Sequence, residues 1–202
     1  AALCDRWQPG VRLLPMTDDQ VETHVIVDDE DGRRAIHFQE WWIRHRAALP
    51  AEQIISMGAE KAKPAPGVIR AIRNADAVII PPSNPVVSVG SILNIEGIRE
   101  AMVGRTVVGV SPIIGGAPVR GMADACLSAI GVETGAGPVA EHLGSDLLDG
   151  WLVDEVDADT RVDGVEVRSR PLYMNDPEST EAIAQAALDL AVELSERGES
   201  AR

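Results

Sequence analysis

Aromatic residues are scarce in this chain of 202 residues, because Phe, Trp and Tyr together make up only 3% of it. Since hydrophobic residues reach 45%, a core of normal size has to be built from Val, Ile, Leu and Ala. Cysteine is nearly absent as well, with Cys4 and Cys126 far apart and in no CxxC spacing. This pattern excludes a disulfide framework and a zinc signature, and it fits a reducing cytosol.

Long apolar runs and positive charge are also lacking. No apolar run approaches the roughly 20 residues that a membrane span needs, and no signal peptide is recognisable. The formal net charge is -14, so the surface as a whole repels nucleic-acid backbones and anionic lipids. Binding to either would need a local basic patch, and the arginines are scattered, as at Arg33, Arg34, Arg44 and Arg46. We therefore expect a cytoplasmic protein without nucleic-acid or membrane partners, although backbone N–H groups still allow a small anionic ligand.

The first part of the sequence predicts a small unit of strands. A strand is expected at 11–16, and the alternation in VETHVIV places Val25 and Val27 on one face with Val21 and Thr23. The acidic DDEDG turn and the following RRAIHF complete a hairpin. A calcium loop is excluded, because the first ligand position counted back from the glycine is valine and no Glu closes the loop. A helix in QEWWIRHRAALP then ends at Pro50, which gives a hairpin–helix insertion over residues 17–50.

The rest of the sequence alternates between short apolar strands and helices. Strands are expected within 53–60, 77–80, 106–112, 150–155 and 165–173, and helices within 65–75, 96–102, 119–131 and 138–144. Continuous apolar strands that alternate with helices indicate a mainly parallel sheet with helices on both faces. The predicted fold is therefore a Rossmann-like α/β fold, formed by residues 1–202 as a single domain.

The last predicted helix begins after Asp176, which can cap it, with Pro177 at its first position. Its buried stripe is expected to consist of Ile183, Ala187, Leu190 and Leu194. We expect the helix to end at Gly198 and the ESAR tail to be disordered. The chain starts with AALCDRW, without Met and as if inside a helix, so we also expect a piece of a longer protein.

Two strand ends carry unusual loops, and ligands of open α/β sheets lie beyond the carboxyl ends of the strands. The first loop, in PPSNPVVSVGSIL, offers a hydroxyl and an amide held by prolines, at Ser83, Asn84 and Pro85, and then the small residue Gly90. The second, in VVGVSPIIGGAPVRG, offers small residues and a cation before a helix, at Ser111, Gly115, Gly116 and Arg120. Each loop alone could be a tight crossover, but the two on consecutive strands predict one ligand cleft. Neither matches a Walker loop or a GxGxxG fingerprint, so generic patterns do not name the ligand.

Four longer motifs in the sequence resemble those of a known protein family. The runs PPSNPVVSVGSILNIEGIREAM and VVGVSPIIGGAPVRGMADACLSAIGVE, together with LLPMTDDQVETHV and FQEWWIRHRA, resemble the CofD family of phospholactate transferases. The resemblance covers essentially all of this chain. It corresponds to only about the C-terminal three-fifths of a family protein. The family's glycine-rich first loop and early aspartates have no counterpart in this sequence.

The resemblance implies a reaction in the biosynthesis of the deazaflavin coenzyme F-420. A guanylyl-activated phosphoenolpyruvate or 2-phospholactate donor would transfer its phospho-carboxylate part to the deazaflavin Fo, with release of GMP and with help from Mg²⁺. Ser83, Asn84, Pro85, Gly90, Ser111, Gly115, Gly116 and Arg120 would then belong to the donor-nucleotide cradle. The catalytic groups and metal ligands would lie in the part that is absent, so we expect this chain alone to be inactive. A homodimer is also expected.

Several single residues have both a functional and a structural interpretation. Thr17, Asp18 and Asp19 could orient the acceptor or bind metal, or form a solvated turn. Trp41 and Trp42 could stack on a deazaflavin, with Trp41 as the acceptor-side candidate, or pack their helix. His24 and His45 are possible bases, although phosphoryl transfer needs no strong base. Asp124 could bind metal or complement the start of a helix.

Two other functions compete with the transferase. Relatives of this fold resemble regulatory proteins that bind UDP-sugars, and a nicotinamide dehydrogenase is disfavoured because no fingerprint loop follows the strands. The acceptor-side motifs TDDQVETHV and FQEWW favour the transferase, and binding of the yellow Fo would separate it from a sensor. The high ratio of Arg to Lys suggests an actinobacterial source and, with it, the enolpyruvyl donor.

Overall fold

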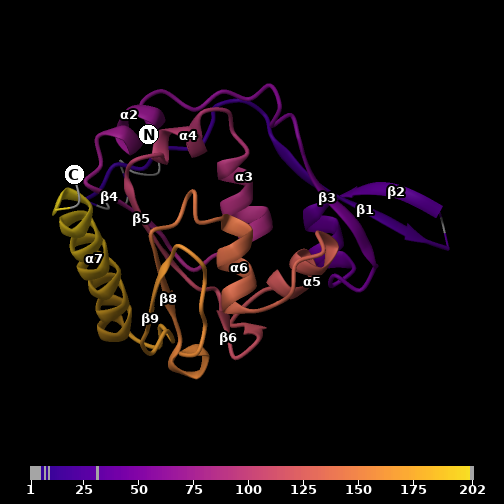
Figure 1. Cartoon of the computed structure of the whole chain (residues 1–202). Helices are drawn as coiled ribbons and strands as arrows, with labels where there is room; N and C mark the ends of the chain where they lie inside the picture. Colours follow the sequence, from indigo (N-terminus) through magenta and orange to yellow (C-terminus); the bar gives the residue numbers. More distant parts are fainter. Residues whose placement is uncertain (1–5, 7, 9, 31, 201–202) are drawn as a thin grey trace.

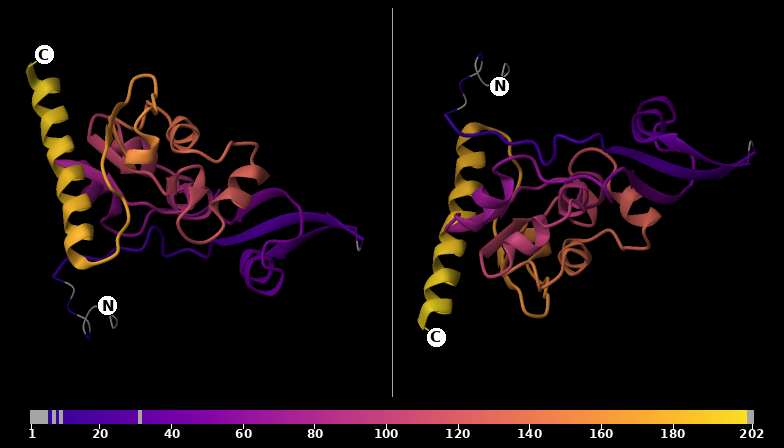
Figure 2. Two further views of the ribbon diagram at one scale, coloured as in Figure 1. Left: turned by 90° about the horizontal axis from the view of Figure 1, so that it is seen from below. Right: turned by 90° about the horizontal axis from the view of Figure 1, so that it is seen from above.

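The computed structural model describes residues 6, 8, 10–30 and 32–200 and shows two larger sheets side by side, besides a small two-stranded one (Figure 1). One is a four-stranded parallel sheet with helices on both faces. The other is a three-stranded antiparallel sheet that projects from it, as the views in Figure 2 also show. The predicted α/β fold with an added hairpin unit is confirmed.

The parallel sheet has the order β4-β5-β8-β9. Its strands are β4 (Ala77–Ile80), β5 (Thr106–Val110), β8 (Gly150–Val153) and β9 (Glu166–Ser169). Successive residues of β5 serve opposite faces: Val107 belongs to the core under α6 (Ala136–Leu143), and Val108 to the core under α7 (Pro177–Ser200). Apart from Thr106 at the start of β5, both central strands are therefore apolar, as the continuous runs in the sequence predicted.

The remaining elements connect these strands along the two faces of the sheet. Before β5 lie α2 (Val68–Arg73), the π-helix η2 (Pro85–Val89), α3 (Gly90–Leu93) and α4 (Ile98–Met102). After it lie the short strands β6 (Ile113–Ile114) and β7 (Ala117–Pro118), α5 (Ala123–Ala129) and the 3-10 helix η3 (Glu155–Asp157). No helix among the described residues is both long enough and apolar enough to cross a membrane.

Helix α7 starts as predicted but ends later. The backbone N–H of Ser179 donates to Asp176 Oδ1 at 2.6 Å, so Asp176 caps the helix. Ile183, Ala187 and Leu190 are buried against the sheet. The predicted end at Gly198 is wrong, because Gly198 does not adopt the left-handed backbone that closes a helix and α7 continues to Ser200. The expected disorder of the ESAR tail stays a prediction, because residues 201–202 lie outside the described residues.

The antiparallel sheet has the order β2-β1-β3 and contains β1 (Glu22–Asp29), β2 (Gly32–His37) and β3 (Ala51–Met57). The predicted hairpin is confirmed, with Val25 and Val27 fully buried. The strand after Pro50 was predicted as part of the parallel rhythm, and that assignment is wrong. It pairs antiparallel with β1, and Val25 lies opposite Ile54. Ala51 and Ile54 of this strand pack against the core of the added unit, which therefore extends to Met57.

Two elements predicted near the N-terminus differ in the structure. Residues 11–16 form no strand, because Val11 and Leu13 stay exposed and Thr17 makes only a single bridge to Pro64. The helix before Pro50 is reduced to the π-turn η1 (Glu40–Arg44) with a short lead-in. It ends early because Arg46 and Ala47 take positive φ values of 52° and 56°, which a helix does not allow.

Candidate functional site

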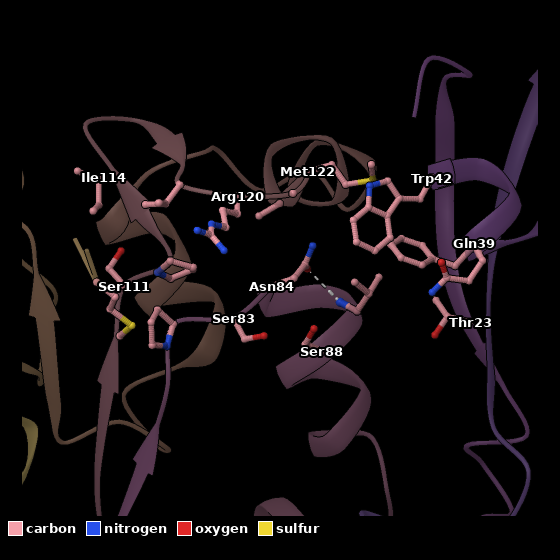
Figure 3. Close-up of a pocket in the computed structure, with 18 of the residues that line it drawn as sticks. Thr23, Gln39, Trp42, Ser83, Asn84, Ser88, Ser111, Ile114, Arg120 and Met122 are labelled. Atoms are coloured by element: carbon pink, nitrogen blue, oxygen red, sulfur yellow. Dashed lines mark hydrogen bonds between the residues drawn. The ribbon is translucent and has the colours of Figure 1, made fainter. Parts of the chain in front are cut away.

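A cleft of about 920 Å³ opens beyond the carboxyl ends of β4 and β5 and reaches across to the antiparallel sheet. Figure 3 shows η2 in its middle, the parallel strands on one side and the strands of the antiparallel sheet on the other. Both strand-end loops line it, as the sequence predicted. Residues 21–23, 37–39 and Trp42 form the opposite wall, and residues 172–175 close one end.

Asn84 holds the first loop in place. Its Oδ1 accepts hydrogen bonds from the backbone N–H groups of Val86 and Val87 at 2.9 and 3.1 Å, which caps η2. Ser83 and Asn84 both line the cleft. Pro85 is buried and lies outside the lining. Ser83 and Asn84 are therefore the members of the predicted first cradle that a ligand reaches directly.

Gly90 has a structural role instead of the predicted ligand contact. It is not part of the cleft lining. Its N–H bonds to Pro85 O, and a Cβ at this position would lie 2.8 Å from that oxygen. Gly90 therefore allows the π-turn to close, and it acts on the cleft only through the shape of η2.

Ser111 and Arg120 differ in what they offer to a ligand. The Ser111 hydroxyl donates to Ile113 O at 2.8 Å and accepts from Ile113 N–H at 3.2 Å, so it fixes the turn after β5. Arg120 is exposed, and no carboxylate of the described residues pairs with it. It is the only lining residue with a permanent positive charge, and Glu22 is the only lining carboxylate among the described residues. An anion in this cleft would thus find one free guanidinium.

The glycine pair of the second loop is not a phosphate cradle. Gly115 and Gly116, at φ 58° and 79°, form the two-residue turn between β6 and β7. Positive φ at both central residues is what such a tight hairpin requires. The Gly115 N–H is already bound to Asp157 Oδ2 at 2.9 Å, and neither glycine lines the cleft. The prediction that they hold the donor is therefore wrong.

The two neighbouring tryptophans have opposite roles. Trp41 is 1% exposed, and its Nε1 donates to Leu49 O at 2.8 Å, so it is a core residue of the added unit. Trp42 is 41% exposed, lines the cleft and lies 5.8 Å from the Phe38 ring. Of the two, only Trp42 offers a ring surface to the cleft, and the choice of Trp41 as acceptor-side candidate is corrected.

The other acceptor-side candidates lie outside the cleft. The Thr17 hydroxyl donates to Lys63 O at 2.6 Å, and Asp19 Oδ2 accepts from Lys63 N–H at 2.8 Å. Together they fasten the segment before β1 to the loop before α2. Asp18 is exposed beside them. None of the three lines the cleft, and the bonds of Thr17 and Asp19 hold these two side chains at Lys63.

His24, His45 and Asp124 are also absent from the lining. The His24 ring lies edge-on to His37, at 5.4 Å between centroids, and it is His37 that faces the cleft. The sequence analysis missed this histidine and also Ser88, Gln39 and residues 172–175. The last group follows β9, a third parallel strand whose carboxyl end reaches the same edge, and that rule could have identified it.

Cys126 lies behind the first loop. It is fully buried, and burial raises the pKa of its thiol, while the neighbouring Asn84 amide acts in the opposite direction. Its neighbours include Val86 and Val87 of η2. Since Cys126 belongs to α5, this contact connects the first loop to the helix that follows the second.

A second, open groove of about 970 Å³ lies away from this cleft and is basic. Arg12, Lys63, Arg70 and Arg73 line it together with one acid, Glu96. The sequence suggested scattered cations, but folding gathers these four. No group of three His, Cys, Asp or Glu side chains among the described residues is arranged to hold a metal ion.

A comparison with protein-family models shows to which family this chain belongs. The model of the family described as "2-phospho-L-lactate transferase CofD" matches residues 1–188. The chain belongs to this family. Curated relatives named phosphoenolpyruvate transferase are 76% identical over 196 residues in Thermobifida fusca and 60% identical over 201 residues in Streptomyces coelicolor. These matches cover 97% and 96% of this chain, but 61% and 63% of the two relatives.

Solved structures agree on the fold. Two crystal structures of a UPF0052-family protein from Bacillus halodurans superpose with TM-scores of 0.57 and 0.58, at 20% and 19% sequence identity. They cover 88% and 93% of this chain and 61% and 64% of the solved chains. At that identity the likeness concerns the arrangement of the elements.

Proposed function

We propose that this chain forms the larger part of a transferase that moves a phosphoenolpyruvate group from a guanylyl diphospho donor to the deazaflavin Fo and releases GMP. Membership of the CofD family and the names of the actinobacterial relatives support this reaction class. Those names also favour the enolpyruvyl donor over the 2-phospholactate donor. The observation that carries the proposal is the single cleft shared by the loops after β4 and β5.

The loop side of the cleft fits the donor. In the reaction the acceptor oxygen forms a bond to phosphorus, the bridging P–O bond breaks, and its electron pair leaves with GMP. Such a step depends on alignment and charge neutralisation more than on covalent catalysis. Arg120 supplies positive charge, and the Asn84 amide and Ser83 hydroxyl supply hydrogen bonds from a fixed loop.

The opposite wall fits a planar acceptor. Trp42 presents an exposed ring beside the largely buried Phe38, and the Met122 side chain reaches toward Trp42 in Figure 3. Aromatic and thioether side chains favour a flat conjugated ring over a sugar. In this arrangement the deazaflavin ring lies against Trp42 and its side-chain hydroxyl extends toward Asn84.

Mg²⁺ stays a prediction, because the cleft contributes only one carboxylate from the described residues, Glu22. A magnesium site usually takes one or two carboxylates besides substrate phosphates and water, so Glu22 would leave most of the ligand positions to the substrate and to water. We therefore derive no step through the metal. The homodimer and the inactivity of this chain alone also stay predictions, which sedimentation and an assay with Fo and a guanylyl donor would test.

Titration calorimetry with GDP tests the donor side. In the full-length protein, Arg120→Ala should weaken GDP binding about tenfold to a hundredfold, because a hydrogen bond to a charged group is worth roughly 1.5–3 kcal/mol. Arg70→Ala is the matched control, since Arg70 is equally exposed but lies in the basic groove. Equal losses in both variants, or none in either, would contradict the donor assignment.

A non-catalytic nucleotide-sugar sensor of the same fold is the second candidate. Its favouring observation is that both strand-end loops, with the free guanidinium of Arg120, line the same cleft. A sensor has no use for the wall formed by Phe38 and Trp42. Visible absorption separates the two functions, because protein that binds Fo turns yellow after gel filtration, and a sensor stays colourless.

A further inference from the structure

The π-turn of the first loop is held by three neighbouring residues. Asn84 caps two N–H groups, Pro85 has no N–H to satisfy, and Gly90 donates to Pro85 O across the wide turn. Any side chain at Gly90 would collide with that oxygen. Single π-turns often occur at functional sites, because they place one side chain where a regular helix would not. The structure thus fixes the direction of the residues inside the turn.

Ser88 is the residue of this turn whose side chain lines the cleft with an unused hydroxyl. Its backbone N–H bonds to Asn84 O at 3.2 Å, and its hydroxyl has no partner among the described residues. The other serines after η2 and β5 differ: Ser91 donates to Val87 O at 3.0 Å, and Ser111 bonds within its own turn. Ser88 therefore keeps its hydroxyl available for a ligand.

The position of Ser88 between the two walls indicates which part of a ligand it meets. In Figure 3 it lies one turn along η2 below Asn84, between Ser83 on one side and Thr23 and Gln39 on the other. Arg120 lies on the same side as Ser83. The Ser88 hydroxyl is thus at the border between the donor loops and the aromatic wall.

We propose that Ser88 binds the attacking hydroxyl of the acceptor and orients it toward the phosphorus. This inference rests on the proposed function. The Ser88 oxygen accepts a hydrogen bond from the acceptor O–H, and its own proton is free for a phosphoryl oxygen. Ser88 is neither base nor nucleophile: the acceptor O–H keeps its hydrogen bond to Ser88 until the new O–P bond has formed, and its proton is then lost to water. Its contribution is alignment, to which such reactions are sensitive.

Steady-state kinetics of Ser88→Ala in the full-length protein tests this role. With Fo and the guanylyl donor, kcat should fall about tenfold, the equivalent of one hydrogen bond, and GDP affinity should stay within twofold. Ser88→Thr, which keeps the hydroxyl, should recover most of kcat. Ser91→Ala is the control, because it removes a nearby serine that points away from the cleft, and it should leave kcat unchanged.

The possible outcomes separate the two proposals. If GDP affinity falls with kcat in Ser88→Ala, the serine contacts the donor nucleotide and the inference is wrong. An unchanged kcat in Ser88→Ala, or equal losses in Ser88→Ala and Ser91→Ala, would overturn it as well. If the unmodified protein neither binds GDP nor transfers to Fo, the proposed function itself fails.

Discussion

The side-chain amide of Asn84 lies against the buried thiol of Cys126, so the cap of the first loop rests on α5. The same Asn84 side chain accepts two backbone hydrogen bonds through Oδ1. One residue thus connects the loop after β4, the π-turn and the helix that follows the loop after β5. Substitutions at Asn84 or at Cys126 should therefore alter the shape of the cleft.

Two substitutions at Asn84 separate its structural from its binding role. Asn84→Ala removes the cap and should lower the free energy of unfolding by about 1 kcal/mol. Asn84→Asp keeps a capping oxygen but loses the amide N–H and adds negative charge. If the amide binds the diphosphate, Asn84→Asp should unfold at nearly the original temperature and yet bind GDP at least tenfold more weakly. Normal GDP binding by Asn84→Asp would show that Asn84 only shapes the loop.

The thiol of Cys126 should make stability depend on alkaline pH. Burial raises its pKa above the reference value of 9.0, so the fold keeps the proton that the unfolded chain loses. The contribution is complete below pH 9.0, and it is lost as pH rises further, through the higher pKa of the folded state. Urea unfolding between pH 8 and 10.5 should therefore show a steeper decline for the original protein than for Cys126→Ala. Parallel declines would contradict this.

The glycine turn gives a prediction about stability without function. Gly116 has φ 79° and no atom near a Cβ position, so Gly116→Ala suffers only from backbone strain. That strain costs about 1–2 kcal/mol. The melting temperature should fall, while GDP affinity stays the same because Gly116 does not line the cleft. A selective loss of GDP binding would restore the phosphate-cradle hypothesis.

The sequence was informative where local patterns decide structure. The apolar runs of β5 and β8 predicted the parallel sheet, and the alternation around Val25 predicted the hairpin. The rule about strand ends placed Ser83 and Arg120 in one cleft although 37 positions separate them in numbering.

The sequence predictions failed where the outcome depends on contacts between residues that are distant in sequence. Gly115 and Gly116 could serve a phosphate or a tight turn, and Asp157, distant in sequence, takes the N–H that a phosphate would need. Arg12 and Arg70 meet only after folding. The strand after Pro50 pairs with β1 because its half-apolar pattern suits a sheet covered on one face.

The adjacent residues Trp41 and Trp42 provide the sharpest test of the acceptor wall. Trp41→Ala leaves a cavity in the core and removes the hydrogen bond to Leu49 O, so it should lower the free energy of unfolding by about 3–5 kcal/mol. Trp42→Ala removes an exposed ring from the cleft and should change the melting temperature little. It should nevertheless weaken Fo binding about three- to tenfold, because an aromatic pair is worth roughly 0.5–1.5 kcal/mol beyond its buried area. Fluorescence titration with Fo, and with GDP as the second ligand, measures both effects. Weaker binding of GDP and Fo alike would indicate general damage to the cleft, and unchanged Fo binding would remove Trp42 from the acceptor site.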